Sequence, residues 1–501
     1  MTNLTHQLLI INDPGQLELI RVVSRVAASQ NVTVAIVGGF IRDSLLGCPA
    51  RDLDLAVKGE AKIFAEELAA QLGATVFALD PDAGMYRLTL QDRVFDQIDV
   101  GAYAGTLTDD LLRRDFTADA LAVPVNTAKL ANNQLTILDP TGGLGDLAKR
   151  ELRAVAPGVF ESDPARLLRS IRLAAESGFK IVPATEQLIA ENAHLASEVA
   201  GERTREDLVK LFSLPSAGTV IEYLDRLGLL TAIFPELEPS RGVDQPIEHN
   251  WDVLGHQIRT VAALDWVLRR GDWLYAPAEA QAIIPFDDDV AAYFAASING
   301  GASRLALTRL GALIHDIAKP ETKTLAPSGR VRFYGHADRG AETAAGMLTR
   351  LRFSQKEIKF VTAMIEAHMR PTQMSPDSSG PTPKAVYRFL RDTGEAATAT
   401  LYLSLADHLA ARGPTLVLDN FREHVTIVAY VLAERTRQRE KTPKRLIDGN
   451  ELQLRFNLKP GPDMGRILET VAEAQATGEV NNKEEALALT RRLIEEYRRA
   501  Q

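Results

Sequence analysis

The sequence predicts an α+β protein, in which a small N-terminal domain with a mixed β-sheet is followed by a long all-α region. Two observations predict this class. Before about residue 150, short runs of β-branched and apolar residues recur, whereas almost every later segment has helical spacing broken by Pro and Gly. The length of 501 residues exceeds what one hydrophobic core usually organises. We therefore expect several domains.

The N-terminal region contains six runs with the composition of β-strands and one amphipathic helix. The helix, at residues 58–73, lies between the second and third strands and ends in a glycine. The predicted strands are residues 32–39, 53–57, 74–79, 86–90, 94–100 and 121–125. This order predicts a compact α/β domain.

Composition and charge exclude several classes of protein. Hydrophobic residues make up 46% and charged residues 25%, which is ordinary for a soluble globular protein. The single cysteine, Cys48, excludes an intrachain disulfide. No Lys or Arg precedes Arg21 and no apolar run is long enough to cross a bilayer, so we expect a cytoplasmic protein without a signal peptide or membrane partner. The net charge of −9 means that a polyanion must be met by local basic patches.

The segment Ile36–Val57 carries two carboxylates inside an apolar pattern. On a strand, Asp52 and Asp54 point to the same face, with Cα atoms roughly 6.5 to 7 Å apart. That spacing suits a shared divalent cation, and oxygen ligands favour Mg²⁺. Gly38 and Gly39 stand between a strand and a helix, where backbone N–H groups can meet a phosphate. The residues alone also fit a plain turn followed by a solvated strand end.

Further motifs decide between these interpretations. The segment GGFIRDSLLGCPARDLDLAV is followed by RRDFTADA, LDPTGGLGDLAKRELRAV, FESDPARLLRSIRLAAESGF and GERTREDLVKLF. In this order, the motifs resemble those of the class II tRNA nucleotidyltransferase and poly(A) polymerase family, which belongs to the DNA polymerase beta superfamily. The resemblance covers residues 31–215 closely and implies a nucleotidyltransferase head.

The resemblance also implies roles for individual residues. Asp52 and Asp54 would hold Mg²⁺, and Asp99 would be the third catalytic carboxylate, with Asp96 as a rival for that role. The implied nucleotide-binding residues are Gly38, Gly39, Arg42, Arg114, Asp115, Asp163, Arg166 and Arg169. Asp163 and Arg166 are adjacent on one helix face, where an acceptor and a forked donor can recognise the edge of a base. RNA contacts are expected from Arg150, Arg153, Arg203, Arg205 and Lys210.

One motif position departs from the family pattern. Where the family motif RRDFTxNA has Asn, this sequence has Asp119. An ionised aspartate only accepts hydrogen bonds, whereas asparagine also donates. A contact that needs a donor at this position would be lost, although the other motif residues predict that activity survives.

The C-terminal half carries a second constellation. Its order of His, His-Asp, His, His and Asp resembles that of the HD phosphohydrolase superfamily, which binds one or two divalent metals in a helical bundle. The implied ligands are His256, His315, Asp316, His336, His368 and Asp407. Imidazole and carboxylate ligands suit a transition metal or Mg²⁺ and can activate water for phosphoester hydrolysis.

Together these features predict four domains. They are a catalytic head at 1–150, a helical neck for nucleotide selection and RNA binding at 151–240, an HD domain at 241–420 and a helical tail at 421–501.

The implied function is template-independent addition of nucleotides from CTP, ATP or both to the 3′ end of tRNA. The head would use Mg²⁺, and the HD domain a divalent metal of unknown identity. Two alternatives remain: poly(A) addition to RNA, or phosphoester hydrolysis by the HD domain with the head as an RNA-binding module. Specificity for CCA, CC or A depends on a loop expected within residues 77–94, and the sequence leaves it open together with the oligomeric state.

Overall fold

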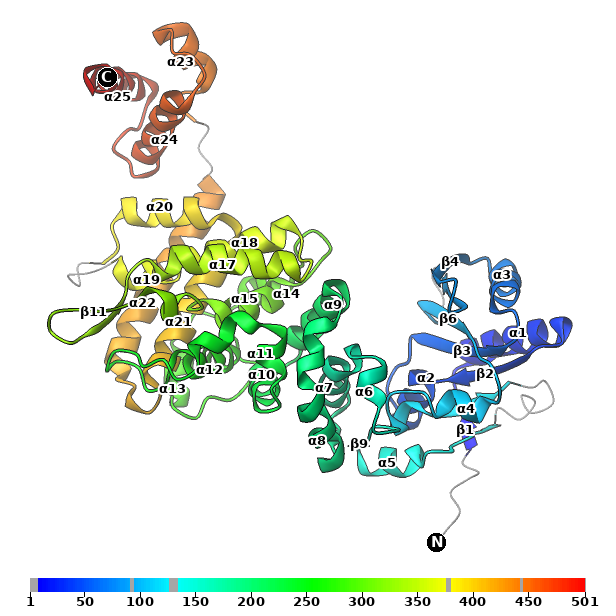
Figure 1. Cartoon of the computed structure of the whole chain (residues 1–501). Helices are drawn as coiled ribbons and strands as arrows, with labels where there is room; N and C mark the ends of the chain where they lie inside the picture. Colours follow the sequence, from blue (N-terminus) through cyan, green and yellow to red (C-terminus); the bar gives the residue numbers. More distant parts are fainter. Residues whose placement is uncertain (1–7, 91–93, 126–133, 375–379, 442–444, 501) are drawn as a thin grey trace. The chain divides into compact units, whose positions relative to one another are not determined.

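The computed structural model describes residues 8–90, 94–125, 134–374, 380–441 and 445–500. The chain divides into two compact units, Met1–Val199 with Leu227–Ala232 and Ala200–Arg226 with Ile233–Gln501. Figure 1 shows strands in the first unit and mostly helices in the second. The predicted α+β class is confirmed. The division into four domains is finer than these two units and stays a prediction.

A six-stranded sheet forms the centre of the first unit, in the order β4-β5-β6-β3-β2-β7. Only β3 and β6 run parallel; the other neighbours are antiparallel, so the sheet is mixed, as expected. Each strand falls on one of the six predicted runs. Their bounds are β2 Thr33–Val37, β3 Asp52–Lys58, β4 Thr75–Asp80, β5 Met85–Thr89, β6 Gln97–Ala102 and β7 Ala122–Pro124.

The helices of the first unit follow from the same periodicity. Helix α3 spans Ala61–Leu72 and packs with its apolar side on β5 and on α1. The remaining helices are α1 Pro14–Gln30, α2 Gly39–Leu46, α4 Leu107–Leu111, α5 Gly143–Lys149, α6 Val159–Ser162, α7 Ala165–Ser177 and α8 Pro183–Asn192. Two small ladders that the sequence analysis missed are β1 Leu8–Ile10 with β8 Gln134–Thr136, and β9 Glu151–Leu152 with β10 Lys180–Ile181. Strands of two or three residues carry too little pattern to detect.

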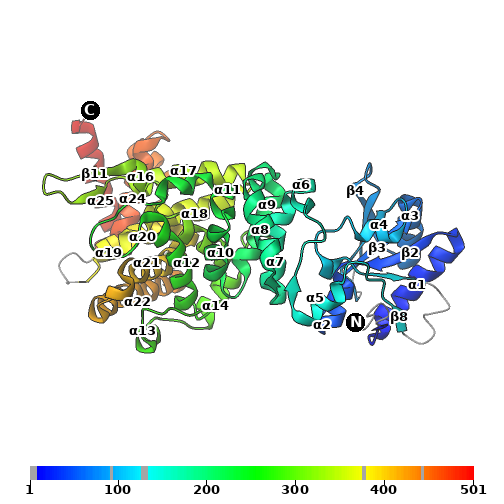
Figure 2. The ribbon, with the colours of Figure 1, turned by 60° about the horizontal axis from the view of Figure 1, so that its bottom comes forward.

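The second unit is a packed set of helices with one short hairpin. Helices α12, α15, α18 and α21 pack against one another in its core, and Figure 2 labels α12, α18 and α21 within the green to orange part of the chain. The elements before the hairpin are α9 Gly201–Ser213, α10 Ala217–Arg226, α12 Val253–Val267, α13 Ala278–Ala282, α14 Asp288–Ala295, α15 Arg304–Ile314 and α16 Lys319–Thr322; α11, Leu229–Ile233, crosses the boundary between the units. The hairpin is β11 Lys323–Leu325 with β12 Val331–Phe333, and after it come α17 His336–Arg350, α18 Gln355–Ala367, α19 Arg370–Gln373, α20 Pro383–Thr393, α21 Ala397–Arg412 and α22 Leu418–Lys441.

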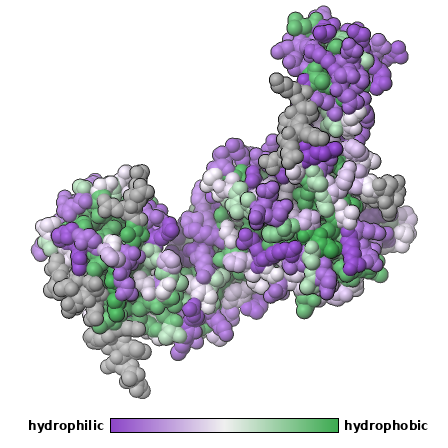
Figure 3. Space-filling model, turned by 180° about the vertical axis from the view of Figure 1, so that it is seen from behind, coloured by the Kyte–Doolittle hydropathy of each residue, from purple (hydrophilic) through white to green (hydrophobic). Residues whose placement is uncertain are grey.

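The last three helices enclose a small core of their own. They are α23 Gly449–Phe456, α24 Pro462–Ala476 and α25 Lys483–Ala500, and their buried residues include Leu452, Ile467 and Val471. Their outer side chains are mostly hydrophilic in Figure 3. Among the described residues, no helix is both long enough and apolar enough to cross a bilayer.

Candidate active site and metal centre

Three carboxylates gather on the two parallel strands at the centre of the sheet. Asp52 and Asp54 lie on β3, where they alternate with the buried Leu53 and Leu55 and therefore share one face. Asp54 pairs in register with Asp99 on β6. Asp96 precedes β6, and its exposed carboxylate lies 3.5 Å from Arg51. The register therefore favours Asp99 over Asp96 as the third carboxylate.

Gly38 and Gly39 lie beside the edge of the sheet that carries these carboxylates. Gly38 has a φ of +73°, and a Cβ there would lie 2.9 Å from Asp54 Oδ2. A side chain at this position would therefore be strained in its backbone and would strike the carboxylate. Gly39 is the first residue of α2, so the N-terminus of this helix opens beside Asp54. Backbone N–H groups at such a terminus suit a phosphate.

The electrostatics of the site fit a divalent cation. Burial and then the charge of Asp99 raise the pKa of Asp54 to about 6, and burial, Asp99 and Asp96 raise the pKa of Asp52. A carboxylate whose pKa is raised by a neighbouring negative charge lies in a negative potential, which a cation relieves. Both oxygens of Asp99 accept from Arg87 on β5, at 2.7 Å each. Hard oxygen donors of this kind fit Mg²⁺.

Asp119, the departure from the family motif, has a clear structural partner. Its buried Oδ1 accepts a hydrogen bond from Arg42 Nη1 at 2.6 Å, while Asp43 accepts from Nε and Nη2 of the same guanidinium. Burial raises the pKa of Asp119, and the charge of Arg42 opposes that rise. An ionised Asp119 can only accept hydrogen bonds, and accepting is what it does here. Arg42, which the sequence analysis expected to bind the nucleotide, therefore contacts two carboxylates.

The predicted nucleotide-selecting residues lie on and near α7. Asp115 is buried and lies 3.1 Å from Arg169 Nε. Arg166 Nη1 donates to the carbonyl of Val159 and to the Ser162 hydroxyl, and its Nη2 donates to the carbonyl of Arg113. The expectation that Asp163 and Arg166 share one helix face is wrong, because Asp163 has extended backbone between α6 and α7; its Oδ2 is nevertheless 3.9 Å from Arg166 Nε. These contacts hold the Arg166 guanidinium in a defined orientation beside Asp163.

Arg114 lies between these groups and the glycine pair. Its Nη2 donates to Asp110 at 3.2 Å, and its Nη1 approaches the position where a Gly38 side chain would begin. The guanidinium is therefore close to the carboxylate edge of β3, and its expected role in nucleotide binding stays a prediction.

Several predicted RNA contacts take part in ion pairs within the protein. Arg153 pairs with Asp146 and Glu151, and Lys210 pairs with Glu206. Arg205 donates to Glu357, and its guanidinium lies 5.2 Å from the Phe353 ring. Arg150 donates to the carbonyl of Ser177, and Arg203 lies on α9. RNA binding by these five residues stays a prediction.

The specificity loop expected within residues 77–94 is only partly described. Residues 77–90 contribute to the β4–β5 hairpin, whereas residues 91–93 lie outside the described part of the chain.

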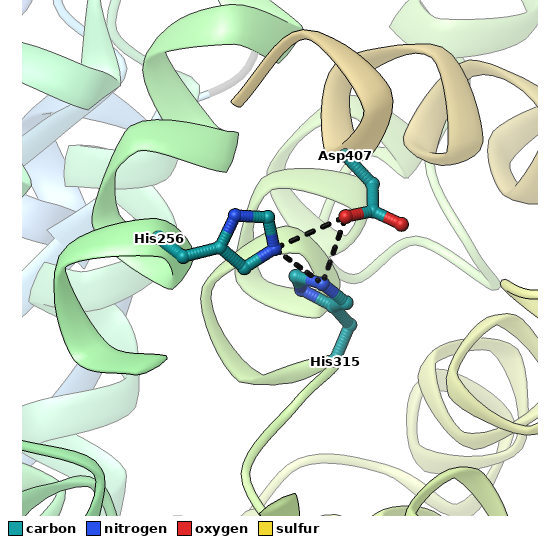
Figure 4. Close-up of side chains that lie close together, drawn as sticks. All are labelled: His256, His315 and Asp407. Atoms are coloured by element: carbon teal, nitrogen blue, oxygen red, sulfur yellow. Dashed lines mark hydrogen bonds and ion pairs between the residues drawn. The ribbon is translucent and has the colours of Figure 1, made fainter. Parts of the chain in front are cut away.

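The histidines predicted in the C-terminal half come together in the core of the second unit. His256 lies on α12, His315 and His368 directly follow α15 and α18, His336 begins α17, and Asp407 lies on α21. Figure 4 shows His256 and His315 facing Asp407; His256 Nε2 is 3.0 Å from Asp407 Oδ1 and 3.3 Å from His315 Nε2.

Asp316 lies between two pairs of histidines. Its Oδ2 is 3.4 Å from His256 and 3.1 Å from His315, and its Oδ1 is 3.4 Å from His336 and 3.7 Å from His368. Among the described residues, the groups of three possible ligands within 4.8 Å of one another are His256 with His315 and Asp407, and His315 with Asp316 and His368. All six predicted ligands therefore belong to one cluster.

Hydrogen bonds at the rear of three rings direct their other nitrogens into the cluster. Nδ1 of His315, His336 and His368 bonds the carbonyls of Ala312, Phe333 and Ile365, respectively. A ring that donates from Nδ1 presents the Nε2 lone pair, the usual metal ligand. The Nε2 atoms of His336 and His368 face each other at 3.4 Å. Two lone pairs at that distance need a proton or a metal ion between them.

The charge balance of the cluster also fits a cation. Burial acts to raise the pKa of Asp316, but His315 and Lys319 outweigh it and hold that pKa well below its usual range. Burial likewise opposes the effect of Asp316 and Asp407 on His315, whose pKa is raised to about 10. The Asp316 carboxylate is buried, and within the described residues its oxygens face only the histidine rings and the Lys319 ammonium. A metal ion would take the place of the His315 proton.

Two residues beside this cluster were not among its predicted ligands. The Lys319 ammonium lies 2.6 Å from Asp316 Oδ2 and donates to Gln245. Its spacing three residues after Asp316 was a usable signal. The His249 ring packs 5.2 Å from that of His256, and burial lowers its pKa to about 3. His249 lies in an irregular segment, where no periodicity predicts the contact.

Known proteins match this chain along its length. The family model "Poly A polymerase head domain" matches residues 34–153, "Probable RNA and SrmB- binding site of polymerase A" matches 178–240, and "tRNA nucleotidyltransferase domain 2 putative" matches 336–490. The A-adding tRNA nucleotidyltransferase of Deinococcus radiodurans is 33% identical over 92% of this chain and 96% of its own length. The chain belongs to the tRNA nucleotidyltransferase family.

A second relative and a solved structure agree with this assignment. The CC-adding tRNA nucleotidyltransferase of Thermus thermophilus is 33% identical over 90% of this chain and 92% of its own length. The CCA-adding enzyme of Thermotoga maritima, solved in complex with tRNA, has a TM-score of 0.61 at 20% identity over 97% of this chain and 96% of that one. At that identity the structure shows a shared fold. Membership of this family makes the chain an enzyme that transfers nucleotides and implies a divalent metal in the head.

Proposed function

We propose that this enzyme adds nucleotides from CTP, ATP or both to the 3′ end of tRNA without a template. The observation that carries the proposal is the pairing of Asp54 with Asp99 across the two parallel strands, beside Asp52 and the N-terminus of α2. The curated relatives named above add A or CC to tRNA, which supports tRNA as the acceptor.

In this proposal different residues of the head bind the metal, the triphosphate, the ribose and the base. Asp52, Asp54 and Asp99 would hold the metal, which lowers the pKa of the attacking hydroxyl and neutralises charge on the phosphates when bound. The N–H groups at the start of α2, with Arg42 and Arg114, bind and orient the triphosphate. Arg169 and Asp115 hold the ribose side, and Asp163 with Arg166 presents donors and an acceptor to the base.

The decisive experiment measures product length. The purified enzyme is incubated with tRNA that lacks its CCA end and with each labelled nucleotide, and with tRNA that already ends in CC. Addition of two C residues indicates a CC-adding enzyme, one A on tRNA-CC an A-adding enzyme, and all three a CCA-adding enzyme. A long A ladder would indicate poly(A) addition instead. Asp52→Ala and Asp54→Ala should abolish every product, and wild-type turnover by either variant at saturating Mg²⁺ would refute the site.

We further propose that the histidine cluster is an HD-type metal centre. Asp316 presents one oxygen to His256 and His315 and the other to His336 and His368, an arrangement suited to two ions that share one carboxylate. Metal analysis of the purified protein should find one or two ions per chain, and His315→Ala with Asp316→Ala should remove them. Because the His315 ring holds its proton up to a pKa of about 10 in the metal-free cluster, the affinity for metal should fall steadily as the pH is lowered through the neutral range. An unchanged metal content in the double variant would contradict the assignment.

A hydrolytic role of this centre is the second candidate function. Such a cluster can activate water at a phosphoester, and the buried Lys319 beside Asp316 supplies a cation for the substrate phosphate. Assays with cyclic and linear phosphoesters, with and without added Ni²⁺ or Mn²⁺, test this role directly. The double variant serves as the control for contaminating phosphatase.

A further inference from the structure

The hairpin β11–β12 projects from the edge of the helical unit, as Figures 1 and 2 show. Residues 323–334, which comprise the hairpin and the residue after it, contain one lysine, two arginines and no carboxylate, in a chain whose net charge is −9. All residues of β11 are exposed, and Tyr334, directly after β12, is 66% exposed. The hairpin therefore offers a local basic surface that the helices do not cover.

The two faces of the hairpin differ in their contacts. The register pairs Thr324 with Arg332, so these two side chains share one face, whereas Phe333 lies on the other face. The Lys319 ammonium, which contacts Asp316, lies 5.4 Å from the centre of the Phe333 ring. The face with Phe333 therefore borders the histidine cluster. The face that carries Arg332 points away from Lys319, and we call it the outer face.

The outer face carries an aromatic ring and two guanidiniums. The Arg332 guanidinium donates to the Tyr334 hydroxyl and lies 5.5 Å from the centre of that ring. The N–H of Ala326 donates to the carbonyl of Arg330 at 2.9 Å, which extends the ladder and places Arg330 on the same face as Arg332. The two arginines are thus roughly 6.5 to 7 Å apart at Cα. Tyr334, Arg332 and Arg330 follow one another in a row.

Carboxylates neutralise little of the charge on this hairpin. Among the described residues, neither Lys323 nor Arg332 forms an ion pair with a carboxylate. Arg330 lies 2.6 Å from Glu248, but these side chains are 58% and 32% exposed, so water screens their attraction. A polyanion can therefore reach the outer face without breaking a buried ion pair.

We propose that the outer face of this hairpin binds single-stranded RNA, with a base stacked on Tyr334 and phosphates at Arg332 and Arg330. Exposed aromatic rings beside guanidiniums bind unstacked bases and the phosphates that join them. A duplex keeps its bases stacked on one another and offers none to the ring, and an acidic peptide has no base to stack. The site rests on the side chains of the hairpin and does not depend on the function proposed for either metal centre.

Fluorescence anisotropy of a short labelled oligouridylate with the full-length protein in EDTA tests the proposal. Tyr334→Ala should weaken binding by about tenfold or more, because it removes the stacking of one base, whereas Tyr334→Phe keeps the ring and most of the affinity. Arg332→Gln should reduce the slope of log K against log salt by about 0.7, the value for one phosphate of a single strand. Arg339→Gln is the matched control, since Arg339 is exposed on α17 and pairs with Glu321 and Glu342. Melting curves establish that each variant folds.

Photo-cross-linking distinguishes this site from RNA contacts elsewhere in the chain. The same oligonucleotide with 4-thiouridine should cross-link within residues 323–334 of the wild type, and Tyr334→Ala should lose that cross-link. Cross-links confined to other segments, or equal affinity of the wild type, Tyr334→Ala and Arg332→Gln, would overturn the site. Competition by an RNA duplex or by oligoglutamate as effective as by the unlabelled single strand would overturn the assignment to single-stranded RNA, in favour of a duplex or an acidic protein segment.

Discussion

At the scale of single residues, strand alternation and strand register bring the three carboxylates of the head together. Asp52 and Asp54 are two apart and share a face for that reason, whereas Asp99 joins them only because β6 pairs with β3 in one register. A shift of one residue would turn Asp99 to the opposite face. The side chains around them, Arg42 and Arg87, are already occupied by carboxylates.

Asp119→Asn tests what the ion pair with Arg42 does. The substitution keeps an acceptor for Arg42 but removes the buried charge, so more of the guanidinium charge acts on a triphosphate. We expect the KM for the nucleotide to fall by roughly threefold to tenfold, with addition activity retained. Steady-state kinetics with a thermal melt as folding control measures this. A KM that rises in a folded variant would mean that the carboxylate holds Arg42 in its working position.

Arg166→Ala tests the selection of the base. The guanidinium is fixed by the carbonyls of Val159 and Arg113 and lies beside Asp163. Its loss should reduce the ratio of kcat/KM between the preferred and the other nucleotides by about tenfold to a hundredfold, more than it reduces triphosphate binding. Arg172→Ala on the same helix, where Arg172 pairs with Glu176, is the control. Proportional losses for all four nucleotides would remove Arg166 from this role.

At the scale of elements, α21 and α22 pack through a buried polar contact. His424 on α22 lies 3.0 Å from the Ser404 hydroxyl on α21, and its ring stacks on His408 at 5.6 Å. Burial, helped by the nearby His408, lowers the pKa of His424 to about 3. The ring is therefore neutral in the folded state over most of the accessible pH range.

This burial predicts a dependence of stability on pH. The unfolded chain protonates His424 below about pH 6.5 and the folded chain does so only near 3, so the stabilisation is complete above 6.5 and is lost as the pH falls. Each pH unit below 6.5 should cost about 1.4 kcal/mol per such histidine. Denaturant titrations of the wild type and His424→Gln at pH 7.5, 6.0 and 5.0 should show a shallower decline in the variant. Parallel declines would show that His424 is protonated in the folded protein.

At the scale of the whole molecule, the two proposed centres lie in different compact units. The carboxylates of the head belong to a sheet in the first unit, and the histidine cluster belongs to the helical core of the second. No described ligand of one centre is a ligand of the other. We therefore expect that mutations can remove metal binding by the histidine cluster without removing nucleotide addition by the head.

Replacement of His315 and Asp316 by Ala is the test of this independence. The double variant removes a buried proton donor together with its carboxylate partner, and it leaves the buried Lys319 ammonium with Gln245 as its hydrogen-bond partner. Nucleotide addition should remain near the wild-type rate while metal binding by the cluster is lost. Circular dichroism and a melting curve establish that the bundle still folds. A folded variant that no longer adds nucleotides would show that the two units are coupled.

The sequence by itself determined the strand and helix pattern, the carboxylate pair on β3 and the residues that form the histidine cluster. These features are local, because alternation, helical spacing and motif order need no knowledge of distant contacts. Six predicted strands and all six predicted ligands of the cluster lie where this local information places them.

Only the tertiary structure decided which distant groups meet. Strand register decides that both oxygens of Asp99 accept from Arg87. Register or the path of irregular segments likewise decides two further contacts, the Arg42–Asp119 ion pair and the packing of His249 on His256. A cavity that Tyr293 lines likewise needs four helices, α14, α15, α21 and α22, from separate parts of the chain. Contacts of this kind arise from the packing of whole elements, and no short stretch of sequence records which element will lie opposite another.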